Sequence, residues 1–342
     1  MKSRLAIAVI VLALALGLVG VEVQGRWQTR LAIPAGGYPF TVNAGESLRG
    51  VATRLHEQGI LAYPRLLLTY GRWSGLDTRI RQGEYLLPQY LDMKALLLLL
   101  AEGKVVQYQL TLPEGISLQR ALQILAADKR LLHRLDGVAD ARILALSAPY
   151  SRPEGLFFPD SYHFERGASD WQILQRSHRR MQSVLATEWA ARADNLPYRT
   201  AYDALIMASI IERETGLPEE RAEIAGVFVR RLQKNMRLQT DPAVIYGLGE
   251  HFDGNLRRRD LHNEANVYNT YRHHGLPPSP IALPGREAIH AALNPAEGDT
   301  LFFVARGDGG HVFSSTLEAH QAAVRQYQLK RRADYRSTPE KH

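Results

Sequence analysis

Residues 208–246 read ASIIERETGLPEERAEIAGVFVRRLQKNMRLQTDPAVIY, and two acids, Glu212 and Glu214, stand near the end of an apolar helical pattern. We expect Gly216 and Pro218 to end this helix. Glu214 then lies in the last turn, where the negative end of the helix dipole and the apolar residues on its face both disfavour a charged carboxylate. The pattern therefore predicts a raised pKa, as a general acid for glycosidic bond cleavage requires.

Spacing alone leaves the roles of these two acids open. Glu214 could equally be a solvated acid paired with Arg213 or Arg221, because structural ion pairs also shift pKa values. Glu212 has apolar neighbours on its own face of the helix. Helical periodicity therefore does not tell which of the two acids is the catalytic one.

The composition is that of an ordinary globular protein, with 342 residues, 45% hydrophobic and 23% charged, enough for two or three domains. A net charge of +7 suits an anionic partner such as a membrane surface or an acidic polymer. The basic residues are spread out and no nucleic-acid-binding motif occurs, so we expect no nucleic-acid partner. The sequence contains no cysteine, which excludes disulfides and Cys-based metal sites.

The N-terminus predicts a membrane anchor. An unbroken apolar run from Leu5 to Val21 follows Lys2 and Arg4. At about 1.5 Å per residue this run is at the short end of what spans a bilayer. No small-x-small cleavage site follows it, so we expect residues 1–23 to be an uncleaved transmembrane anchor rather than a signal peptide. The positive residues place the N-terminus in the cytoplasm and the rest of the chain on the periplasmic side of the inner membrane.

Beyond the anchor we expect an α+β fold. A tether over residues 24–38 leads to two similar phrases, FTVNAGESL at 40–48 and LTLPEGISL at 110–118, each a short strand, a turn glycine and a serine-capped helix. The first phrase resembles the opening of LysM modules, which bind the N-acetylated sugars of peptidoglycan and chitin. The two phrases predict two small LysM-like α+β units, over residues 39–108 and 109–150.

Residues 151–335 are predicted to form a mixed α+β catalytic domain. Helical patterns cover residues 170–192 and 219–233, and a strand at 301–304 should pair with the next one across a glycine-rich turn. After Asp241 many glycines and prolines predict a loop-rich stretch, and loops of that length in a compact domain are usually functional.

The candidate chemistry consists of acids, amides and aromatic rings. No nucleotide-binding, serine-hydrolase or zinc-protease motif occurs and the histidines lack metal-ligand spacing, so we expect neither a metal nor a cofactor. Sugar sites combine aromatic faces with planar amides and hydroxyls. The candidate substrate-binding residues are Glu212, Gln239, Thr240, Asp241, Tyr246, Asn269 and Tyr271. Asn269 could instead stabilise a turn.

Six phrases, in this order, resemble the endolytic murein transglycosylases, also called YceG-like or MltG proteins. The phrases are EGLFFPDSY (154–162), MASIIERET (207–215), RLQTDPAVIYGLG (237–249), YNTYRHHGLPPSPIALPG (268–285), AALNPAEGDTLFFVA (291–305) and GGHVFS (309–314). The resemblance implies an inner-membrane enzyme that faces the periplasm and cleaves nascent peptidoglycan strands internally. It also suggests association with peptidoglycan synthases.

The resemblance separates the two acids. Lytic transglycosylases carry their acid as a glutamate followed by a small hydroxyl residue at a helix end, which Glu214-Thr215 matches and Glu212-Arg213 does not. The resemblance thus implies that Glu214 is catalytic and that Glu212 supports it. In the lytic route the acid protonates the oxygen between N-acetylmuramic acid (MurNAc) and N-acetylglucosamine (GlcNAc). It then takes a proton from the MurNAc C6 hydroxyl, which closes a 1,6-anhydro ring without water.

Two other functions stay open at this point. One is a membrane-anchored, non-catalytic glycan-binding scaffold. The other is a peptidoglycan hydrolase, a muramidase, with Asp241 as the partner carboxylate, because glycoside hydrolases commonly use two. If neither Glu212 nor Glu214 is the acid, Glu154, Asp160 and Asp241 are the next candidates.

Overall fold

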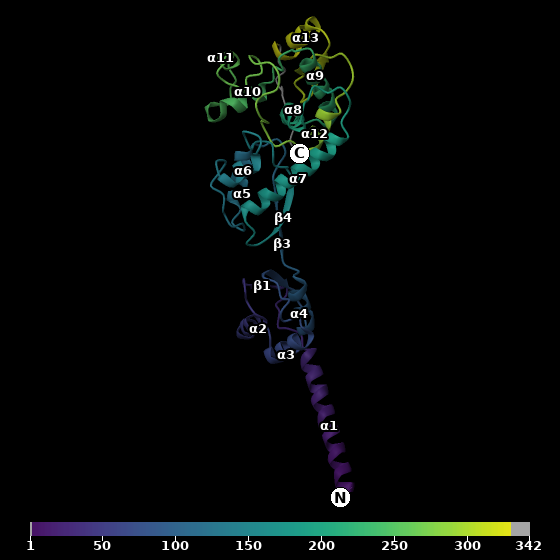
Figure 1. Ribbon diagram of the computed structural model, residues 1–342. Helices are drawn as coiled ribbons and strands as arrows, with labels where there is room; N and C mark the ends of the chain where they lie inside the picture. The colour runs from purple at the N-terminus through teal and green to yellow at the C-terminus, as the bar shows by residue number, and fades with distance from the viewer. Residues whose placement is uncertain (1, 330–342) are drawn as a thin grey trace. The chain divides into compact units, whose positions relative to one another are not determined.

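The computed structural model describes residues 2–329 in two compact units, which we describe one at a time (Figure 1). The N-terminal unit comprises the chain up to Tyr108 together with His163–Gly167, and the second unit comprises Gln109–Tyr162 and the chain from Ala168 onward. Residues 330–335, the end of the predicted catalytic domain, lie outside the described residues, as does residue 1.

Helix α1 (Lys2–Trp27) contains the apolar run. The window Ile10–Trp27 is long and apolar enough to cross a membrane, and none of its described residues is fully buried, although Trp27 at its end is partly buried. This helix fits the single-pass anchor expected over residues 1–23. It also continues through residues 24–27 of the predicted tether, because no proline interrupts the helix before Pro34.

The globular part of the N-terminal unit is a strand, two helices, a strand and a helix. These are β1 (Tyr38–Val42), α2 (Leu48–Glu57), α3 (Pro64–Ser74), β2 (Gly83–Leu87) and α4 (Met93–Glu102). Strands β1 and β2 pair antiparallel, with Phe40 opposite Tyr85. The inward residues of both strands, the apolar stripe of α2 and the leucine run of α4 form one core, so each element buries one face.

Both repeated phrases fold as strand, turn and capped helix. Gly45 and Gly115 adopt the left-handed conformation, with φ of +72° and +74°. The Ser47 hydroxyl accepts the N–H of Gly50 in the first turn of α2, and the Ser117 hydroxyl accepts the N–H of Arg120 in the first turn of α5 (Leu118–Ala127). These features agree with the predicted phrases, whereas the LysM-like character of the two units stays a prediction.

The second phrase does not build a sheet within residues 109–150. Its strand β3 (Gln107–Thr111) pairs with β4 (Ser161–Glu165), which lies about fifty residues later in the chain. Residues 109–150, which include α6 (Ala141–Ser147), are therefore grouped with the residues that follow them and not set apart as a unit of their own.

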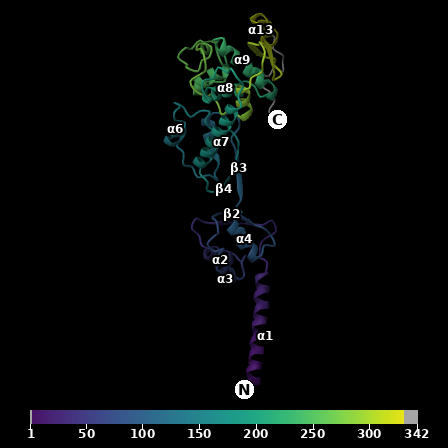
Figure 2. The same ribbon diagram turned by 45° about the vertical axis from the view of Figure 1, so that its right-hand side comes forward.

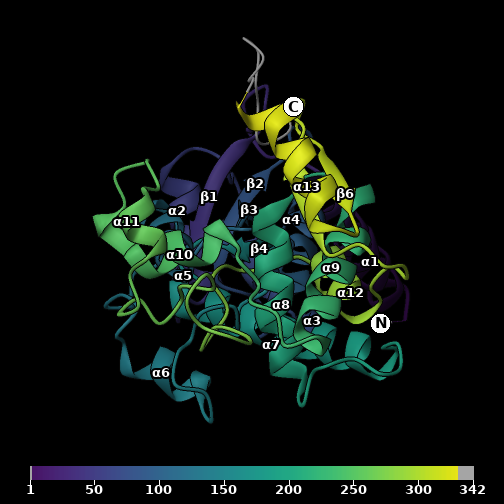
Figure 3. The ribbon, with the colours of Figure 1, turned by 90° about the horizontal axis from the view of Figure 1, so that it is seen from above.

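The centre of the second unit is α8 (Ala201–Glu214), which is buried along most of its length. It packs against α7 (Asp170–Ala190), α9 (Arg221–Gln233), α10 (Asp241–Leu248) and α12 (Arg286–Leu293) (Figures 2 and 3). The predicted helices at 170–192 and 219–233 correspond to α7 and α9. Because helices pack against α8 on several sides, its sequence is apolar on nearly every face.

The stretch after Asp241 is less loop-rich than predicted. It contains α10, the short α11 (Arg258–Leu261) and α12, although residues 262–285 do form an extended loop. Proline in the first turn of α10 is compatible with a helix start, and α12 is fixed by burial of its alanine and isoleucine face against α8. Strands β5 (Phe302–Ala305) and β6 (His311–Ser314) pair antiparallel as expected, and α13 (Leu317–Val324) follows them.

Candidate active site

The last residue of α8 is Glu214, as the sequence predicts. The helix does not end through a left-handed Gly216, however. Thr215 adopts an extended backbone (φ −139°) and its hydroxyl accepts the N–H of Leu217 at 3.0 Å, which turns the chain away from the helix. The carboxyl group of Glu214 therefore lies at the C-terminal end of α8, close to Thr240 and Asp241.

The surroundings of Glu214 raise its pKa to about 7. Burial among protein atoms is the main cause and the nearby negative charge of Asp241 adds to it, whereas the Thr240 hydroxyl and the positive charge of Arg231 lower the pKa. The side chain keeps part of its surface accessible. Arg213, the ion-pair partner considered above, donates instead to the carbonyl oxygen of Gly115 at 3.1 Å. Glu214 therefore has the proton affinity expected of a general acid near neutral pH.

The chain at residues 239–241 is held beside this acid by Thr270. Gln239 N–H donates to the Thr270 carbonyl at 3.2 Å, and Thr240 N–H donates to the Thr270 hydroxyl at 2.9 Å. Gln239 adopts a left-handed backbone (φ +54°), which is uncommon for a residue with a side chain. These two hydrogen bonds and the strained backbone of Gln239 place Asp241 at the first position of α10, close to Glu214.

Two hydroxyl groups belong to this cluster. The hydroxyl of Tyr271 donates to Asp241 Oδ1 at 2.7 Å. The Thr240 hydroxyl is buried without a hydrogen-bond partner, although it lies near enough to Glu214 to lower its pKa. Buried polar groups normally find a partner, and the carboxyl group of Glu214 is the acceptor on which this hydroxyl acts.

Arg231 of α9 is a part of the site that the sequence analysis missed. It is buried, and its guanidinium donates to the carbonyl oxygens of Leu238 and Leu301, both at 2.7 Å. Its charge acts on both Glu214 and Tyr271. The helical spacing could have indicated that Arg231 is buried, because it follows the buried Phe228 and Val227 by three and four residues and so shares their face of α9.

Glu212 points away from this cluster. Its Oε2 accepts the N–H of Gly285 at 3.0 Å, at the start of α12. Burial is the main cause that raises its pKa, and the nearby charge of Glu114 adds to the rise. Two residues along a helix project about 200° apart, which places the two acids in different surroundings. Glu212 thus fastens the loop before α12 to α8.

Tyr246 contacts a second buried acid. Its hydroxyl donates to Glu154 Oε2 at 3.2 Å, and Glu154 Oε1 accepts the N–H of Leu118, the first residue of α5, at 2.8 Å. Glu154 is only 6% exposed, and burial raises its pKa to about 7. Glu154 therefore joins α5 to α10. Asp160, the other reserve candidate, is exposed and accepts the N–H of its neighbour Ser161.

Asn269 is fully buried and its amide is occupied. Its Nδ2 donates to three backbone carbonyl oxygens, and its Oδ1 accepts the N–H of Tyr271. The three carbonyls belong to Asp260, Leu261 and Asn263, at 3.2, 3.2 and 2.8 Å. This placement favours the alternative role, in which Asn269 holds the loop that carries Tyr271, and sugar contact by Asn269 stays a prediction.

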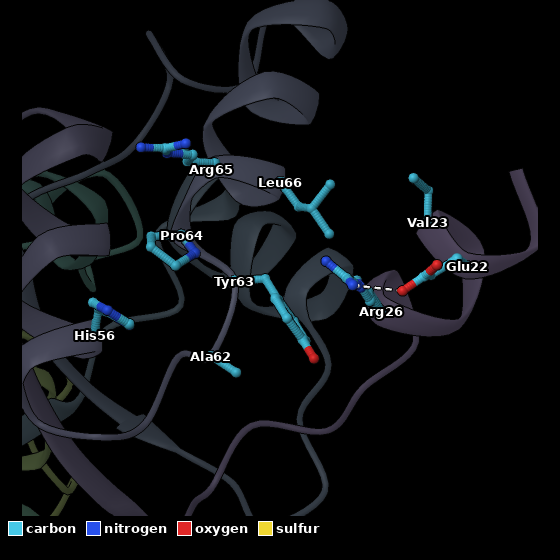
Figure 4. Close-up of a pocket in the computed structure, with 9 residues that line it drawn as sticks. All are labelled: Glu22, Val23, Arg26, His56, Ala62, Tyr63, Pro64, Arg65 and Leu66. Carbon is cyan, nitrogen blue, oxygen red and sulfur yellow. Dashed lines mark hydrogen bonds and ion pairs between the residues drawn. The ribbon is translucent and has the colours of Figure 1, made fainter. Parts of the chain in front are cut away.

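Of the seven candidate residues other than Glu214, three lie beside that acid, namely Thr240, Asp241 and Tyr271. The side-chain oxygen of Gln239 accepts a hydrogen bond from Arg231 at 3.4 Å, and Glu212, Tyr246 and Asn269 occupy separate positions. Within residues 2–329 no three His, Asp or Glu side chains are grouped to hold a metal ion. A cavity of about 510 Å³ lies in the N-terminal unit and contains none of the candidate residues (Figure 4).

The sequence matches one family model and several named proteins. The sequence model of the YceG-like family matches residues 40–326. The chain belongs to the YceG-like family. Two relatives named endolytic murein transglycosylase come from Bacillus subtilis (strain 168) and Streptococcus pneumoniae D39. The first is 29% identical over 310 residues, 84% of either chain. The second is 26% identical over 317 residues, 83% of this chain and 57% of the relative.

A solved structure agrees with this membership. The crystal structure of a YceG-like protein from Listeria monocytogenes matches with a TM-score of 0.54 and 30% sequence identity, over 84% of this chain and 99% of that one. The family resemblance drawn from the six sequence phrases is thereby confirmed.

Proposed function

We propose that this chain is an endolytic lytic transglycosylase of peptidoglycan and that Glu214 is its catalytic acid and base. The family and the relatives' names support the activity. The observation that supports the residue is a carboxyl group with a pKa of about 7 at the end of α8, surrounded by Asp241, Thr240 and Tyr271. Near pH 7 such a group is found in both protonation states, which a residue that gives and then takes a proton needs.

The proposed reaction is balanced by one proton. Protonated Glu214 donates its proton to the oxygen between MurNAc and GlcNAc as the bond from that oxygen to MurNAc C1 breaks. The MurNAc C6 hydroxyl oxygen then bonds to C1, and its proton passes to the Glu214 carboxylate. The products are a GlcNAc hydroxyl end and a 1,6-anhydro-MurNAc end, with no water consumed and the enzyme restored.

The neighbours of Glu214 suit the charges that arise in this reaction. Positive charge develops at MurNAc C1 in the transition state, and the Asp241 carboxylate, which accepts a hydrogen bond from the Tyr271 hydroxyl, is proposed to stabilise it. When Glu214 has lost its proton, the unpartnered Thr240 hydroxyl can donate to it. Gln239 and Tyr271 are proposed to contact the sugar.

Asp241 also supports a second candidate, the muramidase. A second carboxylate close to the acid could activate a water molecule in place of the C6 hydroxyl. Mass spectrometry of glycan strands digested by the full chain in detergent separates the two routes, because hydrolysis adds one water for each bond cleaved and leaves a reducing end on the fragment that carries the new MurNAc terminus. Anhydro ends support the lytic route, and products heavier by one water contradict it. Intact strands would favour a glycan-binding scaffold.

For the cellular location, we infer that α1 anchors the chain in the inner membrane with its N-terminus in the cytoplasm and the catalytic domain in the periplasm. The apolar run after Lys2 and Arg4 motivates this, and peptidoglycan strands at that surface are then the substrate. Association with a peptidoglycan synthase is part of the same proposal. Crosslinking in cells with the full chain tests it, and recovery of no synthase would contradict it.

A further inference from the structure

The end of α1 carries aromatic and basic side chains that pack on α3. The Trp27 ring lies 4.4 Å from the ring of Tyr70, and Tyr70 lies 5.7 Å from Trp73, between ring centroids. The Arg26 guanidinium lies 5.3 Å from the centre of the Tyr63 ring (Figure 4). These contacts connect both ends of α3 to the last turn of the apolar helix.

The outer face of α3, formed by Arg65, Thr69, Arg72 and Trp73, is exposed along its length. These residues recur at helical spacing, opposite the buried Leu67. Trp73 is 82% exposed, more than any other large hydrophobic side chain in the described chain. Helix α3 contains two arginines and no acid. A face that combines exposed tryptophan with arginine is unusual against water and typical of the membrane interface.

The cavity of the N-terminal unit opens beside the same elements (Figure 4). Its lining includes Val23 and Arg26 of α1 and Tyr63, Arg65 and Leu66 at the start of α3. Glu22 of α1 also lines it and forms an ion pair with Arg26, so Arg65 is the lining guanidinium that we expect to bind the phosphate. Its volume is about 510 Å³. Guanidinium groups bind phosphate oxygens, whereas the aromatic and aliphatic members suit the apolar part of a lipid. The lining therefore has the chemistry of a phospholipid headgroup site.

We propose that the outer face of α3 and this cavity lie on the membrane surface and bind the headgroups of anionic phospholipids. The inference rests on the proposed membrane anchor, because α1 is what brings α3 to the bilayer. The surface is continuous with α1 through Trp27 and Arg26, and its positive charge complements an anionic headgroup. The N-terminal unit is then held at the membrane by its own surface as well as by the anchor.

The test uses a matched pair of cysteines, which is possible because the chain has none. Thr69→Cys changes an exposed threonine on the outer face of α3, and Thr41→Cys changes an exposed threonine of β1. Strand β1 lies at the other end of the same unit from α3 (Figure 1). Each full-length variant is labelled with an environment-sensitive fluorophore. It is then reconstituted in phosphatidylcholine vesicles with or without phosphatidylglycerol and with spin-labelled lipid as quencher.

We expect the label at residue 69, but not at residue 41, to emit at shorter wavelength and to be quenched, more strongly when phosphatidylglycerol is present. Adding Arg65→Gln and Arg72→Gln should weaken this docking about fivefold per arginine, the equivalent of about 1 kcal/mol each. Identical behaviour of the two labels in vesicles that carry the protein would overturn the proposal. A chain that does not co-float with vesicles removes the anchor and this inference together. Strand cleavage in detergent tests the catalytic proposal separately.

Discussion

Replacing Glu214 by Gln is the sharpest test of the site, because it keeps the shape of the side chain and removes the exchangeable proton. The pKa of about 7 compares with 4.5 for an ordinary glutamate. At pH 7 about half of the Glu214 carboxyls are then protonated, against roughly 0.3% for an ordinary one, a gain of about 150-fold in the reactive form. We expect Glu214→Gln to lower kcat at least about 10²-fold, the low end of general acid–base catalysis.

The same raised pKa should reduce the stability of the folded protein at alkaline pH, although it favours catalysis. The folded-state pKa lies above the unfolded one, so the free energy of unfolding falls as pH rises from about 4.5 to about 7. At about 1.4 kcal/mol per unit, the cost of the ionised carboxylate reaches at most about 3 kcal/mol above pH 7. Glu214→Gln should therefore unfold at higher urea concentration than the wild type at pH 8 and at a similar one at pH 4.

Glu212→Gln is the matched control, because glutamine can still accept the N–H of Gly285. The assay measures cleavage rates of both variants on the same glycan strands and urea unfolding at both pH values. Glu212→Gln should lose less activity than Glu214→Gln. A dead Glu212→Gln beside an active Glu214→Gln would reverse the roles. Full activity in both would move the acid to Glu154, Asp160 or Asp241, and loss of activity at Glu214 without the alkaline gain in stability would refute the buried-acid argument.

Four further outcomes are expected. Thr240→Val removes a hydroxyl that lowers the pKa of Glu214, so the fall in kcat/KM with rising pH should move to higher pH; an unchanged profile would contradict this. Asn269→Ala loses three hydrogen bonds to carbonyls, which should lower the free energy of unfolding by about 2–3 kcal/mol. A rise in KM at unchanged stability would instead indicate sugar contact. A fragment that begins at residue 109 should unfold cooperatively and one that begins at 151 should not, since the latter lacks β3 and α5; equal behaviour would argue for separate units. Sequencing of the mature N-terminus should find α1 retained and a C-terminal periplasmic reporter should be active, whereas a processed end or a silent reporter would reject the anchor.

Much of the local structure was predictable because local chemistry specifies it. Ser47 and Ser117 cap helices where the sequence places them, and the apolar periodicity of α7 and α9 fixed both helices to within two residues. The pairing of β3 with β4 was not predictable, because it depends on a strand about fifty residues away. The same holds for α12, a short helix that depends on packing against α8.

In the candidate site, too, the local features were predictable and the contacts between distant residues were not. The position of Glu214 at the end of a helix and its raised pKa were predictable, because the helix end and its apolar face are local features. The bond between Tyr271 and Asp241 joins residues thirty positions apart, and no pattern predicts it. Residue type alone also could not separate Asn269, whose amide binds backbone carbonyls, from an amide that binds sugar hydroxyls, since both roles use the same donor and acceptor.

An acid that is half-protonated near neutrality makes the rate of strand cleavage sensitive to the surroundings of the cell. Small ions cross the outer layers of the envelope, so an enzyme on the proposed periplasmic side works at close to the pH of the growth medium. Above pH 7 the protonated fraction of Glu214 falls about tenfold for each further pH unit. Cells grown in alkaline medium should accordingly carry longer glycan strands than cells grown in acidic medium, with no change in the amount of the protein.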